Sequence, residues 1–201
     1  MAALAERRAG LAATASSFAY AYVGAGLGLA LYVGDQLISG AHGLAGEIGY
    51  LPAAVGNGQH VTLSEALARQ GFRRAGAPSI DVPAVLDTAR RAAAGEPAAR
   101  TVIGALGTTI GHAIAAACAI ADPELVLLGG PIGSHAALLE PVRAAAARFS
   151  PAPVHIAAGR TGESAPLQGA LHLALDHGRQ QMITSHAVSP RHAVSPRRGT
   201  G

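Results

Sequence analysis

The chain contains no lysine and no tryptophan, and Cys118 is its single cysteine. Without lysine, a Walker-type GK[ST] phosphate loop and a Schiff-base lysine are both excluded. One cysteine can form neither a disulfide within the chain nor a cysteine-rich metal site. This cysteine usage is typical of a reducing compartment, so we expect a cytoplasmic protein in which Cys118 is a small core residue.

Aromatic residues are scarce as well, at 3% of the 201 residues, while apolar residues reach 50%. The core must therefore consist of Ala, Val, Leu and Ile, in one domain or two small lobes. The formal net charge of +3 is misleading, because four arginines and no acids follow Asp176: Arg179, Arg191, Arg197 and Arg198. Without those four arginines the remainder carries −1. No basic face is implied, and we expect no direct DNA contact from this chain.

Residues 9–34 carry no charge and are long enough to span a membrane. Five glycines interrupt this run, and its second half alternates like a strand. No A-x-A-like cleavage site precedes a plausible mature start. We therefore expect neither a membrane span nor a signal peptide.

Alternation of period two marks the first strand. Phe18, Tyr20 and Tyr22 alternate with alanines, and the glycine-rich segment "GAGLG" and the apolar run "LALYV" follow. After the turn "GDQ" comes "LIS", which completes a predicted meander of three strands.

The rest of the sequence reads as a helical region and then as alternating strands and helices. Helices are predicted at residues 2–13, 62–71, 82–95, 97–121, 135–149 and 164–178. Ser134 is the expected N-cap of the fifth helix and Phe149 is expected to face inward. Residues 53–60 are predicted to be a loop, and residues 124–130 and 153–159 buried parallel strands. This order indicates an α/β fold of the ribonuclease H-like type, the half-unit of actin-like ATPases and sugar kinases.

Residues 178–201 differ in character from the domain predicted at residues 1–177. They contain the tandem repeat "HAVSPRHAVSPR" and have little to bury. We predict a disordered tail. An interaction or nucleic-acid-binding role competes with a frame-shifted or duplicated end, and we favour the latter.

Three segments together resemble the ROK family (repressors, open reading frames and kinases). They are "YVGAGLGLALYVGDQLISGAHGLAGEIGYLP", "IADPELVLLGGPI" and "ESAPLQGALHLAL". The resemblance implies two actin-like lobes with a sugar between them, of which this chain is the second. The first lobe, with its D-x-G-G-T loop and catalytic N-D segment, would precede Met1, so the chain is expected to be truncated.

The resemblance assigns the family's sugar-contacting glutamate to Glu47, which lies between glycines including Gly46. A carboxylate accepts hydrogen bonds from neighbouring sugar hydroxyls, and glycines let the ligand approach. Glu65 falls where the family has a second sugar-contacting glutamate, although a solvated helix position explains it equally well. His42 is either a donor to a sugar hydroxyl or a cap of the turn.

Tyr50 stands where the family usually has a histidine that contacts sugar and ligates a structural zinc. The family's other zinc ligands come from a cysteine loop, whereas this chain has "AAVGNGQH" there, including His60. Because zinc prefers closed Cys and His sites, we predict no zinc and no other bound metal.

Two glycine clusters are candidate nucleotide contacts, namely Gly24, Gly26 and Gly28 in the hairpin and Gly129 and Gly130 after the later strand. A tight hairpin and a strand-to-helix turn explain them as well. Family kinases place threonine where this chain has Ala25, which favours the structural interpretation.

The function predicted first is the sugar-sensing lobe of a ROK transcriptional regulator without kinase activity, a homo-oligomer that binds a small sugar and needs no cofactor. Ala25 and the missing lysine, zinc loop and catalytic aspartate argue against phosphoryl transfer. The alternatives are a ROK sugar kinase that uses ATP and Mg²⁺, and a dimerisation domain without a ligand.

Overall fold

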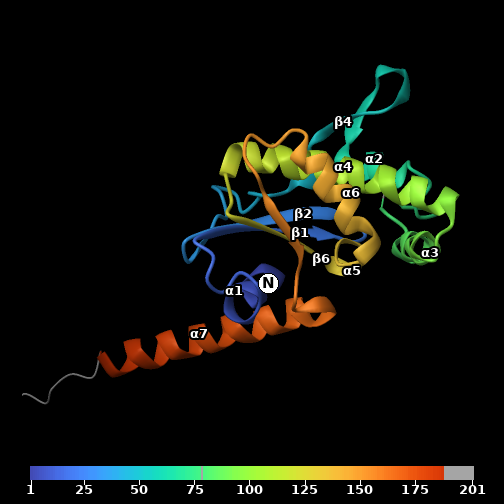
Figure 1. Ribbon diagram of the computed structural model, residues 1–201. Helices are drawn as coiled ribbons and strands as arrows, with labels where there is room; N and C mark the ends of the chain where they lie inside the picture. Colours follow the sequence, from blue (N-terminus) through green and yellow to red (C-terminus); the bar gives the residue numbers. More distant parts are fainter. Residues whose placement is uncertain (78, 188–201) are drawn as a thin grey trace, which may run out of the picture.

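The computed structural model describes residues 1–77 and 79–187 as one central sheet with helices on both faces (Figure 1). Five strands form the sheet in the order β3-β2-β1-β6-β7. Their bounds are β1 Ser17–Val23, β2 Leu27–Val33, β3 Gln36–Leu37, β6 Leu125–Gly129 and β7 His155–Ala158. The first three strands are antiparallel, and β1, β6 and β7 are parallel. The predicted α/β meander followed by parallel strands is confirmed.

Seven helices belong to the described residues, and they divide between the two faces (Figure 1). Their bounds are α1 Ala2–Ala9, α2 Leu63–Ala68, α3 Val82–Ala93, α4 Pro97–Ala121, α5 Gly130–Gly133, α6 Ala136–Ala147 and α7 Ala165–Ala187. In Figure 1, α4 and α6 lie above the sheet and α1 and α7 below it. The sheet therefore separates a larger core from a smaller one.

The alternation of β1 builds both cores. Ala19, Ala21 and Val23 face the larger core together with the buried side of α4. Phe18 and Tyr20 face the smaller core, where the Phe18 ring stacks on Tyr32 with 5.0 Å between ring centroids. Side chains of opposite parity point to opposite faces of a strand, so the predicted period of two is realised here.

Helices α4 and α6 pack closely because glycine lies at their contact. A Cβ on Gly111 would lie 2.6 Å from the Cβ of Ala145, and one on Gly107 would lie 2.5 Å from the Cβ of Pro141. Helix α4 is also long and apolar enough to cross a membrane by length and composition, but half of its most apolar stretch is buried inside the molecule. We interpret α4 as a core helix.

Several predicted boundaries were wrong. The first helix ends at Ala9 rather than at residue 13, since Gly10 is extended. Residues 53–60 contribute to a small hairpin of β4 (Pro52–Ala54) and β5 (His60–Thr62), joined through a 3-10 turn at Gly56–Gly58.

Around α6, two further predictions were wrong. The N-cap is His135, whose Nδ1 accepts from the N–H of Ala137, while the Ser134 hydroxyl donates to the Gly130 carbonyl and closes α5. Phe149 is 61% exposed and contacts His112 instead of facing the core.

Strand β7 and helix α7 also differ from expectation. Strand β7 is an edge strand in which only Ile156 is buried, so it is not a strand covered on both faces. Helix α7 continues to Ala187, into the segment for which a disordered tail is predicted. Apart from His186 and Ala187, the tandem repeat lies outside the described residues.

Candidate functional site

The glutamate turn is held by the backbone of β2. The Gly46 carbonyl accepts from the N–H groups of Leu29 and Ile48, both at 2.7 Å. Gly46 has a φ of +88°, and a Cβ at this position would overlap the Leu29 carbonyl oxygen. Only glycine satisfies both conditions. Glu47 follows immediately and begins the 3-10 turn Ile48–Tyr50.

The Glu47 carboxylate is available to a ligand. The side chain is exposed, and within residues 1–77 and 79–187 no hydrogen bond or ion pair engages its carboxylate. It opens onto a cavity of about 320 Å³, here named the Glu47 pocket. The lining residues are Met1, Ala2, Ala3, Tyr20, Tyr22, Gly28, Leu29, Ala30, Glu47 and Pro166. An apolar cavity with one carboxylate and two phenols suits a small polyol.

Tyr22 lines this pocket and is 40% exposed. Its two partners across the sheet are Gly28 on β2 and Gly129 on β6, so no side chain flanks it on either strand. A Cβ on Gly24 would lie 2.8 Å from the Tyr22 hydroxyl oxygen, and one on Gly130 would lie 2.8 Å from Tyr22 Cε2. The ring therefore occupies the space between the glycine hairpin and the turn after β6.

Tyr20 supports the pocket from below. It is 4% exposed and its oxygen accepts a hydrogen bond from the Gly130 backbone. Burial, and next the nearby Glu6 carboxylate, raise the pKa of Tyr20 above its ordinary value. The phenol is consequently neutral at physiological pH and serves as a hydrogen-bonding group.

Glu6 is a buried carboxylate with a full set of partners. Its Oε1 accepts from both the N–H and the hydroxyl of Thr161 at 2.8 Å, and its Oε2 accepts from the Leu11 N–H at 3.0 Å. The side chain is 0% exposed. These bonds connect α1 to the turn that precedes α7, and so fix the helices that form the floor of the Glu47 pocket.

His42 and Glu65 are not among the residues that line the Glu47 pocket. His42 lies in the exposed loop before Gly46. Glu65 is on α2, where its Oε1 pairs with Arg69 Nη2 at 2.6 Å. Of the four predicted sugar contacts, the structure thus brings only Glu47 into the lining of this pocket. Gly46 precedes it in the turn, and the other two lie elsewhere.

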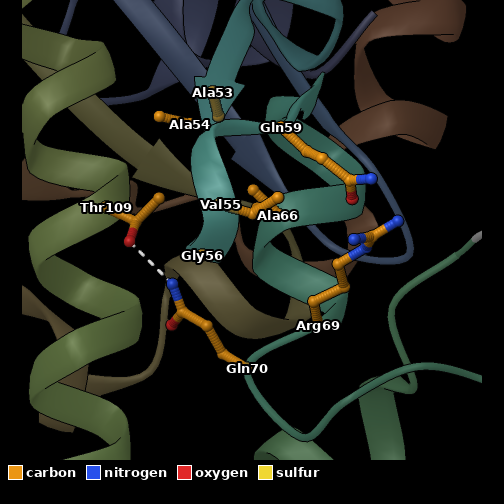
Figure 2. Close-up of a pocket in the computed structure, with 9 residues that line it drawn as sticks. All are labelled: Ala53, Ala54, Val55, Gly56, Gln59, Ala66, Arg69, Gln70 and Thr109. Atoms are coloured by element: carbon orange, nitrogen blue, oxygen red, sulfur yellow. Dashed lines mark hydrogen bonds between the residues drawn. The ribbon is translucent and has the colours of Figure 1, made fainter.

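A second cavity, of about 430 Å³, lies beside the β4–β5 hairpin (Figure 2). Figure 2 shows Gln70, which follows α2, donating to Thr109 of α4, and the Nε2–Oγ1 distance is 2.7 Å. The Gln70 Oε1 is buried and has no partner in the described part of the chain. Ala53 and Ala54 line the cavity where larger side chains would fill it, so the hairpin is loosely supported.

The described residues contain no group of three or more His, Cys, Asp or Glu side chains that could hold a metal ion. Tyr50 is 76% exposed, and Cys118 is buried within α4. Burial raises the pKa of the Cys118 thiol to about 11, as expected of a core residue rather than a nucleophile.

The hairpin glycines have different surroundings. A Cβ on Gly26 or Gly28 would meet nothing within 4 Å, so these two positions have no steric need for glycine. The hairpin tip is nonetheless fixed, because the Ala25 carbonyl accepts from the Ile80 N–H at 3.0 Å. Gly130 has a φ of +79° and requires glycine for its turn.

Two residues of this site were missed from the sequence. Glu6 is the only acid in the first helix, and Tyr22 continues an aromatic alternation into a glycine cluster. Both features can be seen in the sequence, but neither indicates which strand or loop the side chain contacts in the fold.

The location of the pocket agrees with the general rule for α/β sheets. Tyr22 and Gly129 lie at the carboxyl ends of the parallel strands β1 and β6. Ligands of such sheets bind outside those ends, because the loops there leave a crevice.

Solved structures with this fold include a ROK hexokinase from Thermus thermophilus, 28% identical with a TM-score of 0.65, covering 84% of this chain and 60% of that one. A ROK glucokinase from Streptomyces griseus, in complex with glucose and AMPPNP, is 24% identical with a TM-score of 0.70, covering 86% and 64%. A ROK transcriptional regulator, a homologue of the E. coli MLC protein, is 24% identical with a TM-score of 0.65, covering 84% and 48%.

The chain spans less than two thirds of the length of each of these three proteins. No curated protein matches the sequence. The model of the ROK family matches residues 1–177, which cover the sheet and the Glu47 pocket. The actin-like ATPase fold and the resemblance read from the glycine-rich segments are thereby confirmed, and the chain belongs to the ROK family.

Proposed function

We propose that this chain is the sugar-sensing lobe of a ROK transcriptional regulator and that it has no kinase activity. The observation that carries the proposal is the Glu47 carboxylate in the lining of an apolar pocket, exposed and unpaired within the part of the chain that the structure describes. Such a carboxylate accepts hydrogen bonds from two neighbouring hydroxyls of a sugar, while the apolar walls receive its C–H faces.

The surroundings of the glycine hairpin support sensing over phosphoryl transfer. Ala25 offers no hydroxyl at the hairpin tip, and the chain has no lysine. Phosphoryl transfer depends on positioned positive charge around the transferred group. Among the residues that line the Glu47 pocket, the only acidic or basic side chain besides the two phenols is the acid Glu47.

In an intact regulator, a sugar in this pocket would favour one closure angle between two lobes and so shift DNA affinity. DNA contact would come from another part of such a protein. We further propose that the protein is cytoplasmic, homo-oligomeric and free of zinc.

Calorimetric titration tests the sugar site. The chain is titrated with glucose, N-acetylglucosamine and xylose, and Glu47→Ala and Glu47→Gln are compared with wild type. We expect at least one sugar to bind, with a loss of about tenfold or more in the variants because hydrogen bonds to a charged acceptor are removed. Glu140→Ala is the matched control, since this exposed carboxylate lies on α6. Equal heats for wild type and Glu47→Ala with every sugar would contradict the proposal.

The alternative function is an ATP-dependent sugar kinase, and the likeness to the hexokinase and the glucokinase favours it. It would place ATP and Mg²⁺ against Gly24, Gly26 and Gly28 and against Gly129 and Gly130. A coupled assay for ADP release, with each sugar at saturation, separates the two functions. We expect no sugar-dependent ADP release, and a sugar-dependent rate would favour the kinase.

A further inference from the structure

The aromatic ring of Tyr22 is the one feature at the pocket that neither sugar binding by Glu47 nor the fold accounts for. Tyr22 is 40% exposed although it lies on a central strand of the sheet. Its cross-strand neighbours are Gly28 and Gly129, so no side chain on the adjacent strands stands beside the ring at the end of β1.

The ring occupies a position that a phosphate would need. Phosphates bind to glycine-rich turns through backbone N–H groups, and this requires that no side chain stand in front of them. Here Tyr22 lies within contact distance of both glycine elements, 2.8 Å from the ideal Cβ positions of Gly24 and Gly130. A phosphate chain between these two turns would overlap the phenol.

The charged side chains act in the same direction. The lining of the Glu47 pocket contains no arginine side chain, and Glu47 would repel an anion. The two arginines of α1 are engaged elsewhere. Arg7 is bound to Asp35 and to the carbonyl of Ala15, and Arg8 is bound to Asp176.

We propose that Tyr22 is a specificity-determining residue that restricts this pocket to uncharged polyols and excludes nucleotides and sugar phosphates. This inference rests on the proposed function and narrows its ligand class. The face of the ring that remains exposed contributes apolar contact to a neutral sugar held by Glu47.

The test compares wild type with Tyr22→Thr and Tyr22→Val, which remove the ring and retain β-branched side chains suited to a strand. Tyr22→Phe keeps the ring, and Tyr50→Thr removes a tyrosine that does not line the pocket. Each protein is titrated with Mg²⁺·AMPPNP, pyrophosphate, glucose and glucose 6-phosphate. Circular dichroism and thermal melts establish that each variant is folded, and either of the two β-branched variants suffices.

We expect AMPPNP and pyrophosphate to bind the Thr or Val variant and to give no heat with wild type, Tyr22→Phe or Tyr50→Thr. Glucose should bind the Thr variant about fivefold more weakly than wild type, because an aromatic contact is lost. Glucose 6-phosphate should not bind wild type.

Two results would overturn the inference: wild type binds AMPPNP as well as the ring-deleted variants do, or a folded ring-deleted variant gains no affinity for either phosphate ligand. If wild type binds glucose and the variants gain nothing, this inference fails and the proposed function stands. If the variants gain phosphate binding and no protein binds sugar, the proposed function fails and the role of Tyr22 in excluding phosphate stands.

Discussion

The two faces of the central sheet are covered to different degrees, and β1 displays the difference within one strand. Toward α4, Ala19, Ala21 and Val23 are each at most 1% exposed. Toward α1 and α7, the exposure of Phe18, Tyr20 and Tyr22 rises along the strand from 0% through 4% to 40%. Along β1 the first face is closed from Ala19 to Val23, whereas the second opens at the carboxyl end of the strand, where the Glu47 pocket lies.

The difference teaches that the two faces of one sheet are held by different kinds of contact, apolar packing on the covered face and directed polar interactions on the open one. The covered face has small residues and closely packed helices, so its contacts are dispersion and apolar burial. The open face has aromatic rings, a buried carboxylate and a free one, which supply directed interactions. Four predictions test this division, from the largest expected effect to the smallest.

The open face should lose most stability when Glu6 is replaced by alanine. This substitution leaves the Thr161 and Leu11 donors without the carboxylate, at part-buried positions around a side chain that is itself 0% exposed. We expect the free energy of unfolding to fall by about 3 kcal/mol, measured by urea denaturation. Glu124→Ala is the control, because this carboxylate is exposed and accepts two hydrogen bonds, both from Ser16, where Glu6 accepts three. A smaller loss for Glu6 than for Glu124 would refute the division.

On the covered face, two alanine substitutions in one helix should have opposite signs. Gly111→Ala places a methyl group 2.6 Å from both the Ala145 Cβ and the Val142 carbonyl oxygen, so we expect a loss of about 2 kcal/mol. Gly104→Ala meets nothing within 4 Å and should gain up to about 1 kcal/mol through helix propensity. Urea denaturation of both variants measures the contrast, and equal signs would show that α4 and α6 are not closely packed.

The covered face should also protect Cys118. Burial raises the pKa of this thiol to about 11, so the folded protein should react with DTNB at pH 8 far more slowly than the urea-unfolded protein. Below the pKa that Cys118 has in the unfolded chain, the thiol is protonated in both states, so its ionisation does not change the free energy of unfolding there. Stability should then fall as the pH rises from about 9 toward 11, because only the unfolded chain ionises there. If Cys118 in the folded protein reacted with DTNB as fast as in the unfolded protein, α4 would be shown to open readily.

The smallest effect is expected at the Arg7–Asp35 pair, at the edge of the open face. The Arg7 guanidinium lowers the pKa of Asp35, so any stabilisation is present above the unfolded pKa and is lost as the pH falls through the folded value. Asp35→Asn should be slightly less stable than wild type at pH 7 and equal to it near about pH 2. A difference in urea midpoint that persists in acid would assign the effect to packing instead.

The sequence predicted the sheet well because its signals are local. Alternation identified β1, and the continuous apolar run identified β6 between its two parallel neighbours. Helix α4 was predicted with its observed bounds, since Pro97 opens it and Asp122, with a φ of +42°, ends it. Phe149 was misplaced because periodicity continues past Ala147, where the helix ends.

The site was predicted in part. Glu47 could be proposed as a candidate because the resemblance covers it and the adjacent residues, and the turn at Gly46, with a φ of +88°, is a local property. Tyr22 could not be predicted as a site residue, because its role depends on which residues stand beside it on β2 and β6. The pairing between distant strands cannot be deduced from the sequence of either strand alone. Glu6 meets Thr161 across most of the chain for the same reason.

The glutamate turn also has a consequence for how the chain tolerates mutation. Gly46 is fixed by its backbone conformation and by the Leu29 carbonyl, whereas the Glu47 side chain is exposed and its carboxylate has no hydrogen bond or ion pair within the described residues. A saturation library at position 46 should therefore yield few soluble proteins, and one at position 47 should yield mostly folded ones. The fold fixes the backbone position of residue 47 but does not depend on which side chain it carries. Single substitutions at position 47 could therefore change the ligand without a prior gain in stability.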